Sequence, residues 1–146
     1  MYTARVSEQV CPLFTFYPDD RGPGVHLTDY VSLATYHRAW LVLEVGDMGA
    51  LSTVDCLLLQ ATDTAGTDAK VIAGKAITQL TQAGGDASSL VCIELQTEEL
   101  DVDNSFDCIA AYITTAVNTV IFSATIYGVE TRFGAVPTTE WAEIVG

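Results

Sequence analysis

The clearest signal in the sequence is a period of two within short apolar runs. In the run 119–130, the even-numbered residues from Val120 to Ile126 are all apolar, and the residues between them are mixed. The run 39–45 shows the same pattern, with its odd-numbered residues apolar. Successive side chains of a β-strand point to opposite faces, so both runs predict strands that pack one face on a core.

Turn-forming residues separate these runs from one another. The runs are rich in Val, Ile, Leu, Thr and aromatic residues, whereas Gly, Asp, Asn and Thr cluster in the gaps. This order of strand and turn is typical of all-β domains. We therefore predict an all-β fold, an antiparallel β-sandwich of which the jelly roll is one form, with less than about 15% helix. The predicted strands are 39–45, 53–61, 90–96, 107–115 and 119–130.

Two segments have a mixed pattern. In 70–82, the apolar spacing would also suit a helix, but Gly74 in mid-run and two Thr residues favour a bent strand. In 97–101, the sequence TEELD predicts a single helical turn with Thr97 as its N-cap.

The two ends of the chain differ in composition from its centre. Residues 17–24, YPDDRGPG, hold two prolines, two glycines and three charges, which predicts an exposed loop. We therefore expect an extended N-terminal arm and loop over residues 1–28, a sandwich body over 29–135 and a C-terminal tail over 136–146. Trp141 in the tail would be costly to leave in water, so it should pack back or insert into a neighbour.

Length and composition predict one soluble domain. The chain has 146 residues, 49% of them hydrophobic, with a mean hydropathy of +0.31. That is enough for one core, while every apolar run is too short to cross a membrane. We expect no signal peptide, because the N-terminus has no unbroken apolar segment. The four cysteines form no CxxC pair, so we expect free thiols in a reducing cytoplasm, buried at Cys56, Cys92 and Cys108.

The charge balance excludes two classes of partner. Six Lys and Arg stand against nineteen Asp and Glu, which gives a net charge of −13. Binding to nucleic acid or to anionic lipid needs clustered cations, so we expect neither nucleic-acid nor membrane binding. The remaining interpretations are a self-repelling soluble surface or an acidic surface that meets a basic protein.

The stretch 101–108, DVDNSFDC, resembles the start of a calcium loop because Asp101, Asp103 and Ser105 alternate. An EF-hand loop needs Gly at its sixth position and Glu at its twelfth, and here those positions hold Phe106 and Tyr112. The stretch is therefore interpreted as an acidic turn that leads into a strand, and no metal site is predicted.

Catalytic patterns are also weak. Cys11 and His26 could be imagined as a thiol and its base, but no third orienting group accompanies them. The acids Glu98 and Glu99 are adjacent and would point to different sides. We expect no enzyme activity and no cofactor. Exposed Tyr36 and Trp40 on one face would be the beginning of a carbohydrate-binding patch, though packing explains them equally well.

Several segments, taken in order, resemble one family across most of the chain. The sequence is similar to small virion proteins of tailed bacteriophages that are encoded near the major capsid protein and described as structural or head-decoration (cement) proteins. The segments that carry this resemblance are VSEQV (6–10), DYVSLATYHRAWLVLEVG (29–46), LLQATDTAGTDAKVI (58–72), TEELDVDNSFDCI (97–109) and SATIYGVETRF (123–133).

The resemblance implies a bacteriophage capsid decoration protein, made in the host cytoplasm and placed on the exterior of the phage head. Its expected partners are the major capsid protein and itself, as a homotrimer at a three-fold position of the lattice. The alternatives are a head–tail connector, a tail component or a carbohydrate-binding module. The residues expected at capsid or subunit interfaces are Val6, Val10, Leu13, Phe14, Arg21 and Trp141.

Overall fold

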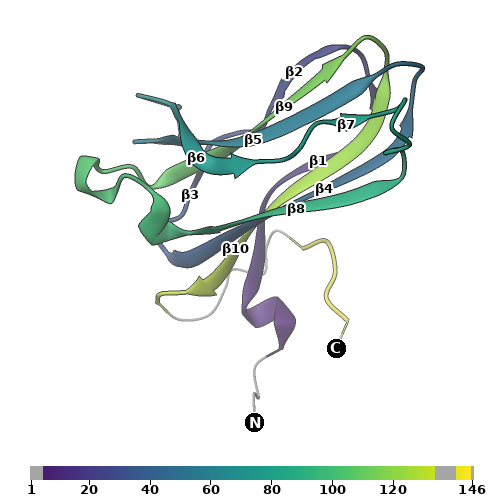
Figure 1. Ribbon diagram of the computed structural model, residues 1–146. Helices are drawn as coiled ribbons and strands as arrows, with labels where there is room; N and C mark the ends of the chain where they lie inside the picture. Colours follow the sequence, from purple (N-terminus) through teal and green to yellow (C-terminus); the bar gives the residue numbers. More distant parts are fainter. Residues whose placement is uncertain (1–4, 134–140, 146) are drawn as a thin grey trace.

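A computed structural model describes residues 5–133 and 141–145 of the chain, and it is built almost entirely from β-strands (Figure 1). The described residues contain no α-helix, only three single 3-10 turns, which are η1 (Val6–Glu8), η2 (Thr97–Glu99) and η3 (Val102–Asn104). The strands are β1 (Val10–Arg21), β2 (Gly24–Leu27), β3 (Val31–Ser32), β4 (Tyr36–Met48), β5 (Thr53–Ala61), β6 (Lys70–Ala76), β7 (Leu80–Thr81), β8 (Ser89–Gln96), β9 (Cys108–Ala116) and β10 (Val120–Thr131).

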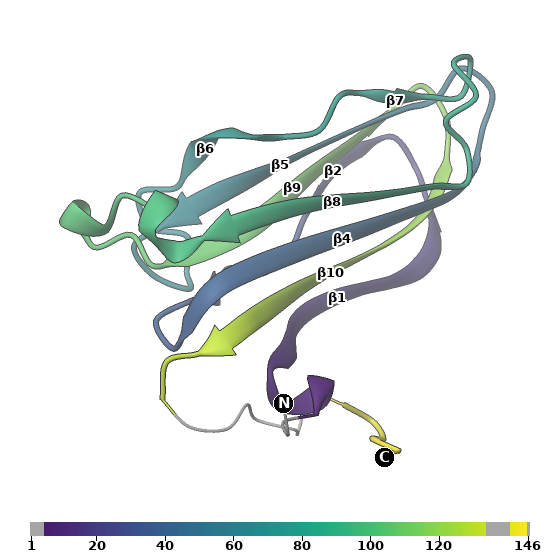
Figure 2. The ribbon, with the colours of Figure 1, turned by 60° about the horizontal axis from the view of Figure 1, so that its bottom comes forward.

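The strands form two antiparallel sheets that pack face to face. Sheet A has the order β1-β10-β4-β8, and Figure 2 shows this sheet in front of sheet B. Sheet B has the order β2-β9-β5-β6, with β3 beside β9 and β7 beside β5. The prediction of an antiparallel β-sandwich is confirmed.

The topology is that of a jelly roll. Strands β2 and β3 follow one another along one edge of β9, and β6 and β7 do the same along β5. Each sheet therefore has four strand positions, eight in all. Numbered along the chain, these positions run 1-8-3-6 in sheet A and 2-7-4-5 in sheet B, the order of a jelly roll.

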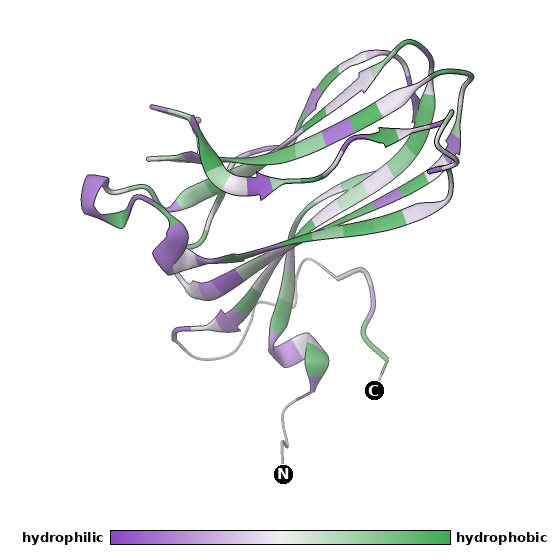
Figure 3. Cartoon of the chain, viewed as in Figure 1, coloured by the Kyte–Doolittle hydropathy of each residue, from purple (hydrophilic) through white to green (hydrophobic). Residues whose placement is uncertain are grey.

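The core lies between the sheets and follows the predicted alternation. In β10, Val120, Phe122, Ala124 and Ile126 are all buried, and Figure 3 shows hydrophobic residues alternating with paler ones along the strands. In β4, the odd-numbered residues from 39 to 45 are buried as well. Full burial of one such large side chain stabilises the fold by roughly 1.5–3 kcal/mol. The two predicted strand faces are confirmed.

The expected loop over residues 17–24 is wrong. Residues 17–21 complete β1, an edge strand of sheet A, and β2 begins at Gly24. An edge strand tolerates proline, because one side of its backbone pairs with nothing. Its register also shifts beside Pro12 and in the segment that contains Pro18, so neither residue interrupts a regular ladder.

It follows that residues 10–27 are part of the sandwich and not an extended arm. Removal of residues 1–25 would delete an edge strand of sheet A, so it would not release a free appendage from an intact body. Within the predicted tail, residues 136–140 and 146 lie outside the described residues.

The two mixed segments are resolved in detail. Segment 70–82 is a bent strand, as predicted, since β6 and β7 flank a break and Gly74 adopts a φ of +76°. Residues 97–99 form the predicted helical turn, but its N-cap is Gln96 and not Thr97. The Thr97 hydroxyl instead donates to the His37 carbonyl (3.1 Å) and accepts from Arg132 (2.6 Å).

Candidate functional site: the outer face of sheet A

The solvent side of sheet A carries several apolar and aromatic side chains, together with polar residues such as Glu44 and Ser123. In register, Val42 of β4 pairs with Thr125 of β10 on one side and with Cys92 of β8 on the other. Leu90, next along β8, is 70% exposed. We call this surface the outer face, made by Thr15, Trp40, Val42, Leu90, Cys92, Ile121, Thr125 and Tyr127.

Two aromatic residues lie side by side at one end of the outer face. Trp40 and Tyr127 are direct cross-strand partners, and their ring centroids lie 5.8 Å apart with the planes tilted by 40°. Trp40 is 39% exposed, so part of its indole is open to solvent. Of the two interpretations of Tyr36, an exposed patch with Trp40 or packing, the structure supports packing, because Tyr36 is buried.

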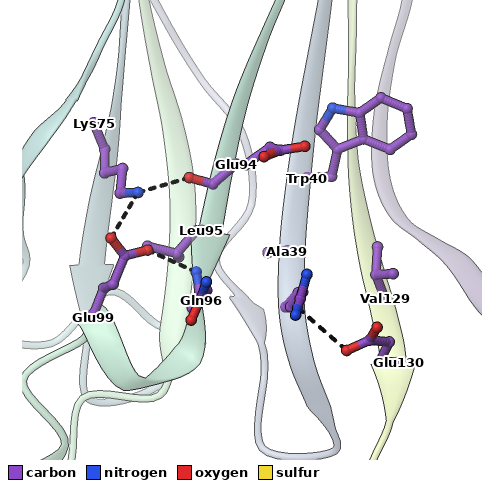
Figure 4. Close-up of a pocket in the computed structure, with 10 residues that line it drawn as sticks. Ala39, Trp40, Lys75, Glu94, Leu95, Gln96, Glu99, Val129 and Glu130 are labelled. Atoms are coloured by element: carbon purple, nitrogen blue, oxygen red, sulfur yellow. Dashed lines mark hydrogen bonds and ion pairs between the residues drawn. The ribbon is translucent and has the colours of Figure 1, made fainter.

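A hollow of about 290 Å³ lies beside Trp40 (Figure 4). Strands β4, β8 and β10 supply most of its wall, and Lys75 reaches it from β6 of the other sheet. Its lining residues are Arg38, Ala39, Trp40, Lys75, Glu94, Leu95, Gln96, Glu99, Val129 and Glu130.

Ion pairs fix two sides of the hollow. Arg38 Nε lies 3.3 Å from Glu130 Oε2, and Lys75 Nζ lies 2.9 Å from Glu99 Oε1. Glu99 also accepts a hydrogen bond of 2.8 Å from the Gln96 N–H. That N–H, and then the Lys75 ammonium, lower the pKa of Glu99.

Lys75 has a second role at the edge of sheet A. Its Nζ donates to the backbone carbonyl of Glu94 on edge strand β8, at 2.8 Å. A lysine on a sheet edge hinders the addition of a further strand, and here the same side chain also links the edges of the two sheets.

The carboxylate of Glu94 is different from its neighbours. Within residues 5–133 and 141–145, it makes no hydrogen bond and no ion pair. Figure 4 shows it extending from β8 toward Trp40. The hollow therefore contains two cations and three carboxylates, and one of these carboxylates, Glu94, is free to accept.

Two cations elsewhere in the described chain, Lys70 and Arg21, also contact groups of the chain itself. Lys70 pairs with Asp101 and lies 4.1 Å above the ring of Phe106. The Arg21 guanidinium lies 4.7 Å from the ring centroid of Phe16 and donates to the Tyr17 carbonyl. The electrostatic potential at the surface is therefore negative, since only three carboxylates of the described residues take part in ion pairs.

The acidic stretch 101–108 is a turn, as predicted. The Asp101 carboxylate binds Lys70 and also accepts from Asn104 at 2.8 Å, and these two donors lower its pKa. Ser105 adopts the left-handed conformation, with φ +65°, that reverses the chain. Phe106 and Ile109 are buried and anchor the turn. Among the described residues, no cluster of three or more His, Cys, Asp or Glu side chains could hold a metal ion.

The cysteines divide into two groups. Cys11, Cys56 and Cys108 are buried, and burial raises the pKa of Cys56 and of Cys108 to about 12. Cys92 is exposed on the outer face, so the expectation that it is buried is wrong. The run 90–96 belongs to an edge strand, with only one face on the core.

His26 closes one end of the core. Its Nε2 lies 3.1 Å from both the Gly22 carbonyl and the Thr115 hydroxyl, and its ring meets Phe122 edge-on at 5.4 Å. These contacts describe a histidine that packs against the core.

No helix among the described residues is long and apolar enough to cross a membrane.

The residues predicted at interfaces do not form one patch. Leu13 packs against the core and Phe14 lies edge-on to Phe16 at 5.1 Å, so both serve the sandwich itself. Arg21 covers the end of the core between Phe16 and Phe122. Val6 is exposed in η1, Val10 pairs with Val129, and the Trp141 indole N–H is buried with no acceptor among the described residues. Their role at an interface stays a prediction.

The alternation of 39–45 places Trp40 on an outward face, but the sequence contains no sign of the hollow. Tyr127 and Glu94 join Trp40 only through the pairing of β4 with β10 and with β8. The alternation of polar residues in each strand gave the direction of these side chains, but not which strands are neighbours.

Comparison with known proteins gives no family for this chain. No protein-family model matches it, and no curated protein matches it. Among solved structures, a chain from broad bean stain virus is similar with 9% identity and a TM-score of 0.49, covering 99% of this chain and 98% of that one. A chain from desmodium yellow mottle tymovirus has 10% identity and a TM-score of 0.41, covering 94% and 96%.

A third similar chain comes from infectious bursal disease virus, Gt strain. It has 5% identity and a TM-score of 0.31, and the match covers 90% of this chain and 45% of that one. All three TM-scores are below 0.5, so the fold assignment rests on the strand pairing itself.

Proposed function

We propose that this chain is a structural protein of a virion, and specifically that it decorates the outside of a tailed-bacteriophage head. In this role it binds the major capsid protein and holds neighbouring subunits together. The mechanism is adhesion and involves no chemical reaction. A protein that binds only the mature lattice stabilises that lattice by mass action, and many copies multiply the effect.

The observation that carries the proposal is the outer face of sheet A. Exposed Trp40 and Leu90 and half-buried Val42 and Tyr127 lie on this face, and a protein partner that covered them would stabilise the complex, because such groups gain free energy when they leave water. The jelly roll adds weaker support, since this topology is common in viral capsid and lectin domains but does not determine function.

The charge distribution favours the exterior of the head over its interior. A net charge of −13, with three of the six Lys and Arg residues paired with carboxylates inside the chain, repels packaged DNA. The same charge keeps free copies of the protein apart in solution until a lattice is available.

Co-sedimentation with purified heads tests the proposal. We expect the full chain to sediment with expanded, mature heads, and Leu90→Glu to reduce bound protein by at least about tenfold, because a charge would be buried in the interface. Val71→Glu is the matched control, since Val71 is 56% exposed but lies on β6 of the other sheet. Absence of binding by the full chain, or equal effects of the two substitutions, would contradict the proposal.

Copy number separates head decoration, or a tail-tube component, from a head–tail connector. Quantitative mass spectrometry of purified particles should find hundreds of copies for a lattice protein, whereas a connector would be present in about a dozen. The proposed homotrimer is tested by sedimentation equilibrium of the free chain and of the chain released from heads. A monomer in both samples would refute it.

One observation favours carbohydrate binding as a second candidate function. Trp40 and Tyr127 lie together on an exposed face, beside the polar side chains of the hollow, and sugars bind such aromatic surfaces. A screen of the full chain against bacterial surface glycans tests this alternative. Binding that Trp40→Ala removes would favour it over head decoration if no binding to heads is found.

A further inference from the structure

The hollow beside Trp40 contains an uncompensated negative charge. Arg38 is paired with Glu130, and Lys75 is paired with Glu99, which leaves Glu94. A carboxylate with no partner, on the surface of a chain whose net charge is −13, attracts a cation from outside.

An aromatic surface lies next to this carboxylate. Trp40 is the direct cross-strand partner of Glu94 across β4 and β8, and Figure 4 shows the Glu94 carboxylate directed toward the indole. Tyr127 packs against the other side of Trp40 and limits the positions that the indole can adopt. A cation above an indole ring is stabilised by about 0.5–2 kcal/mol, more when the site excludes water.

We infer that this hollow receives an arginine side chain from the protein partner, with the guanidinium stacked on Trp40 and paired with Glu94. The inference rests on the proposed function, because it names the chemistry by which the partner is recognised. A guanidinium fits the site better than an ammonium, since it is planar, stacks on an aromatic ring and can bond both oxygens of one carboxylate.

The size and surroundings of the hollow agree with this occupant. A volume of about 290 Å³ lies at the lower limit of the range for small-molecule sites and can hold a single long side chain. Val42 and Cys92 continue the surface away from Trp40, so the partner should present apolar groups beside its arginine. Arg, Trp and Tyr are also the residues that most often dominate the energy of protein interfaces.

Binding of short peptides to the full chain tests the inference directly. The probes are acetyl-Leu-Arg-Leu-amide and its citrulline and lysine analogues, and the readout is the NMR shift of the Trp40 indole N–H. We expect the arginine peptide to shift this signal in a saturable way and the neutral citrulline peptide to bind about tenfold more weakly. The lysine peptide should fall between them.

Two charge-matched variants distinguish a specific contact with Glu94 from the effect of the overall negative charge of the protein. Glu94→Gln should weaken binding of the arginine peptide by about tenfold, while Asp103→Asn, in the exposed turn η3, removes the same charge and should change it less than twofold. Equal losses in both variants, or equal binding of the arginine and citrulline peptides, would overturn the inference. So would a Trp40 signal that does not move.

The inference and the proposed function can fail separately. If heads bind the full chain and its Glu94→Gln variant equally, the arginine site is refuted and head decoration stands. If the chain binds the arginine peptide with the expected pattern but no head, the site stands and the virion role is refuted.

Discussion

Replacement of Gly128 by alanine should destabilise the fold although it adds a single methyl group. Gly128 lies in β10, at the centre of sheet A, and the ring of Tyr36 packs on it. A Cβ at this position would lie 2.7 Å from Tyr36 Cδ1 and 2.8 Å from both Cε1 and Cγ. Three ring atoms at this distance cannot be avoided by a small rotation of the side chain.

The expected loss follows from this geometry. Ordinary contact begins near 3.4 Å, so the ring has to move by at least about 0.7 Å within a buried site. Overpacking of this kind costs about 1–3 kcal/mol, whereas alanine in place of glycine in a strand gains about 0.5–1 kcal/mol. We expect a net loss of about 1–2 kcal/mol in the free energy of unfolding.

Urea denaturation measures this loss. With a slope of about 2 kcal/mol per molar urea, the unfolding midpoint of Gly128→Ala should fall by about 0.5–1 M. Gly46→Ala is the matched control, because Gly46 lies in neighbouring β4 and a Cβ there would make only ordinary contact, 3.5 Å from Ile121. Its midpoint should stay the same or rise.

A double-mutant cycle identifies Tyr36 as the cause. In a Tyr36→Leu background, Gly128→Ala should cost at least about 0.5 kcal/mol less than in the natural chain, because the planar ring is gone. If Gly128→Ala is no more destabilising than Gly46→Ala, or if the Tyr36 substitution leaves its cost unchanged, the close contact between ring and backbone is refuted.

The remaining predictions concern thiols, acid stability, the acidic turn and calcium. A thiol reagent at pH 8 should label one cysteine per folded chain, Cys92, and all four in denaturant, because buried thiols such as Cys56 stay protonated. The pKa of Glu99 is lowered in the folded chain, so ionised Glu99 stabilises the fold above pH 4.5, the ordinary pKa, and this stabilisation is lost as the pH falls through the folded pKa. The difference in Tm between the natural chain and Glu99→Gln should therefore shrink below about pH 4.5. Lys70→Met should cost less than about 1 kcal/mol but speed proteolysis of residues 97–107, and unchanged cleavage would contradict the anchoring role of Lys70. Calcium should leave Tm unchanged, because Lys70 and Asn104 already occupy the Asp101 carboxylate.

The strands that could be predicted are those in which apolar residue types coincide with buried positions. The even-numbered positions of β10 are apolar because they line the core, and this regularity is visible in the sequence alone. Strand β1 gave no such signal. It lies at an edge and carries register shifts near its prolines, so its composition resembles that of a loop.

The candidate site could not be predicted because it depends on which strands are neighbours. Trp40, Glu94 and Tyr127 belong to three strands, β4, β8 and β10, that lie far apart in the sequence. One interpretation of the sequence placed Tyr36, four residues away, beside Trp40, but the Tyr36 ring packs on Gly128 instead. Local periodicity describes the direction of a side chain, and only the register of the sheet determines what lies beside it.

The position of β10 has a consequence for how the protein is made. This strand lies between β1 and β4, so its side chains meet residues translated much earlier, as in the contact of Thr15 with Thr125, 110 positions apart. Until residues 120–131 leave the ribosome, β1 has no partner in sheet A and one edge of β4 is unpaired. A nascent chain that stalls before residue 120 therefore exposes core side chains to solvent, and exposed apolar surface of this kind favours aggregation.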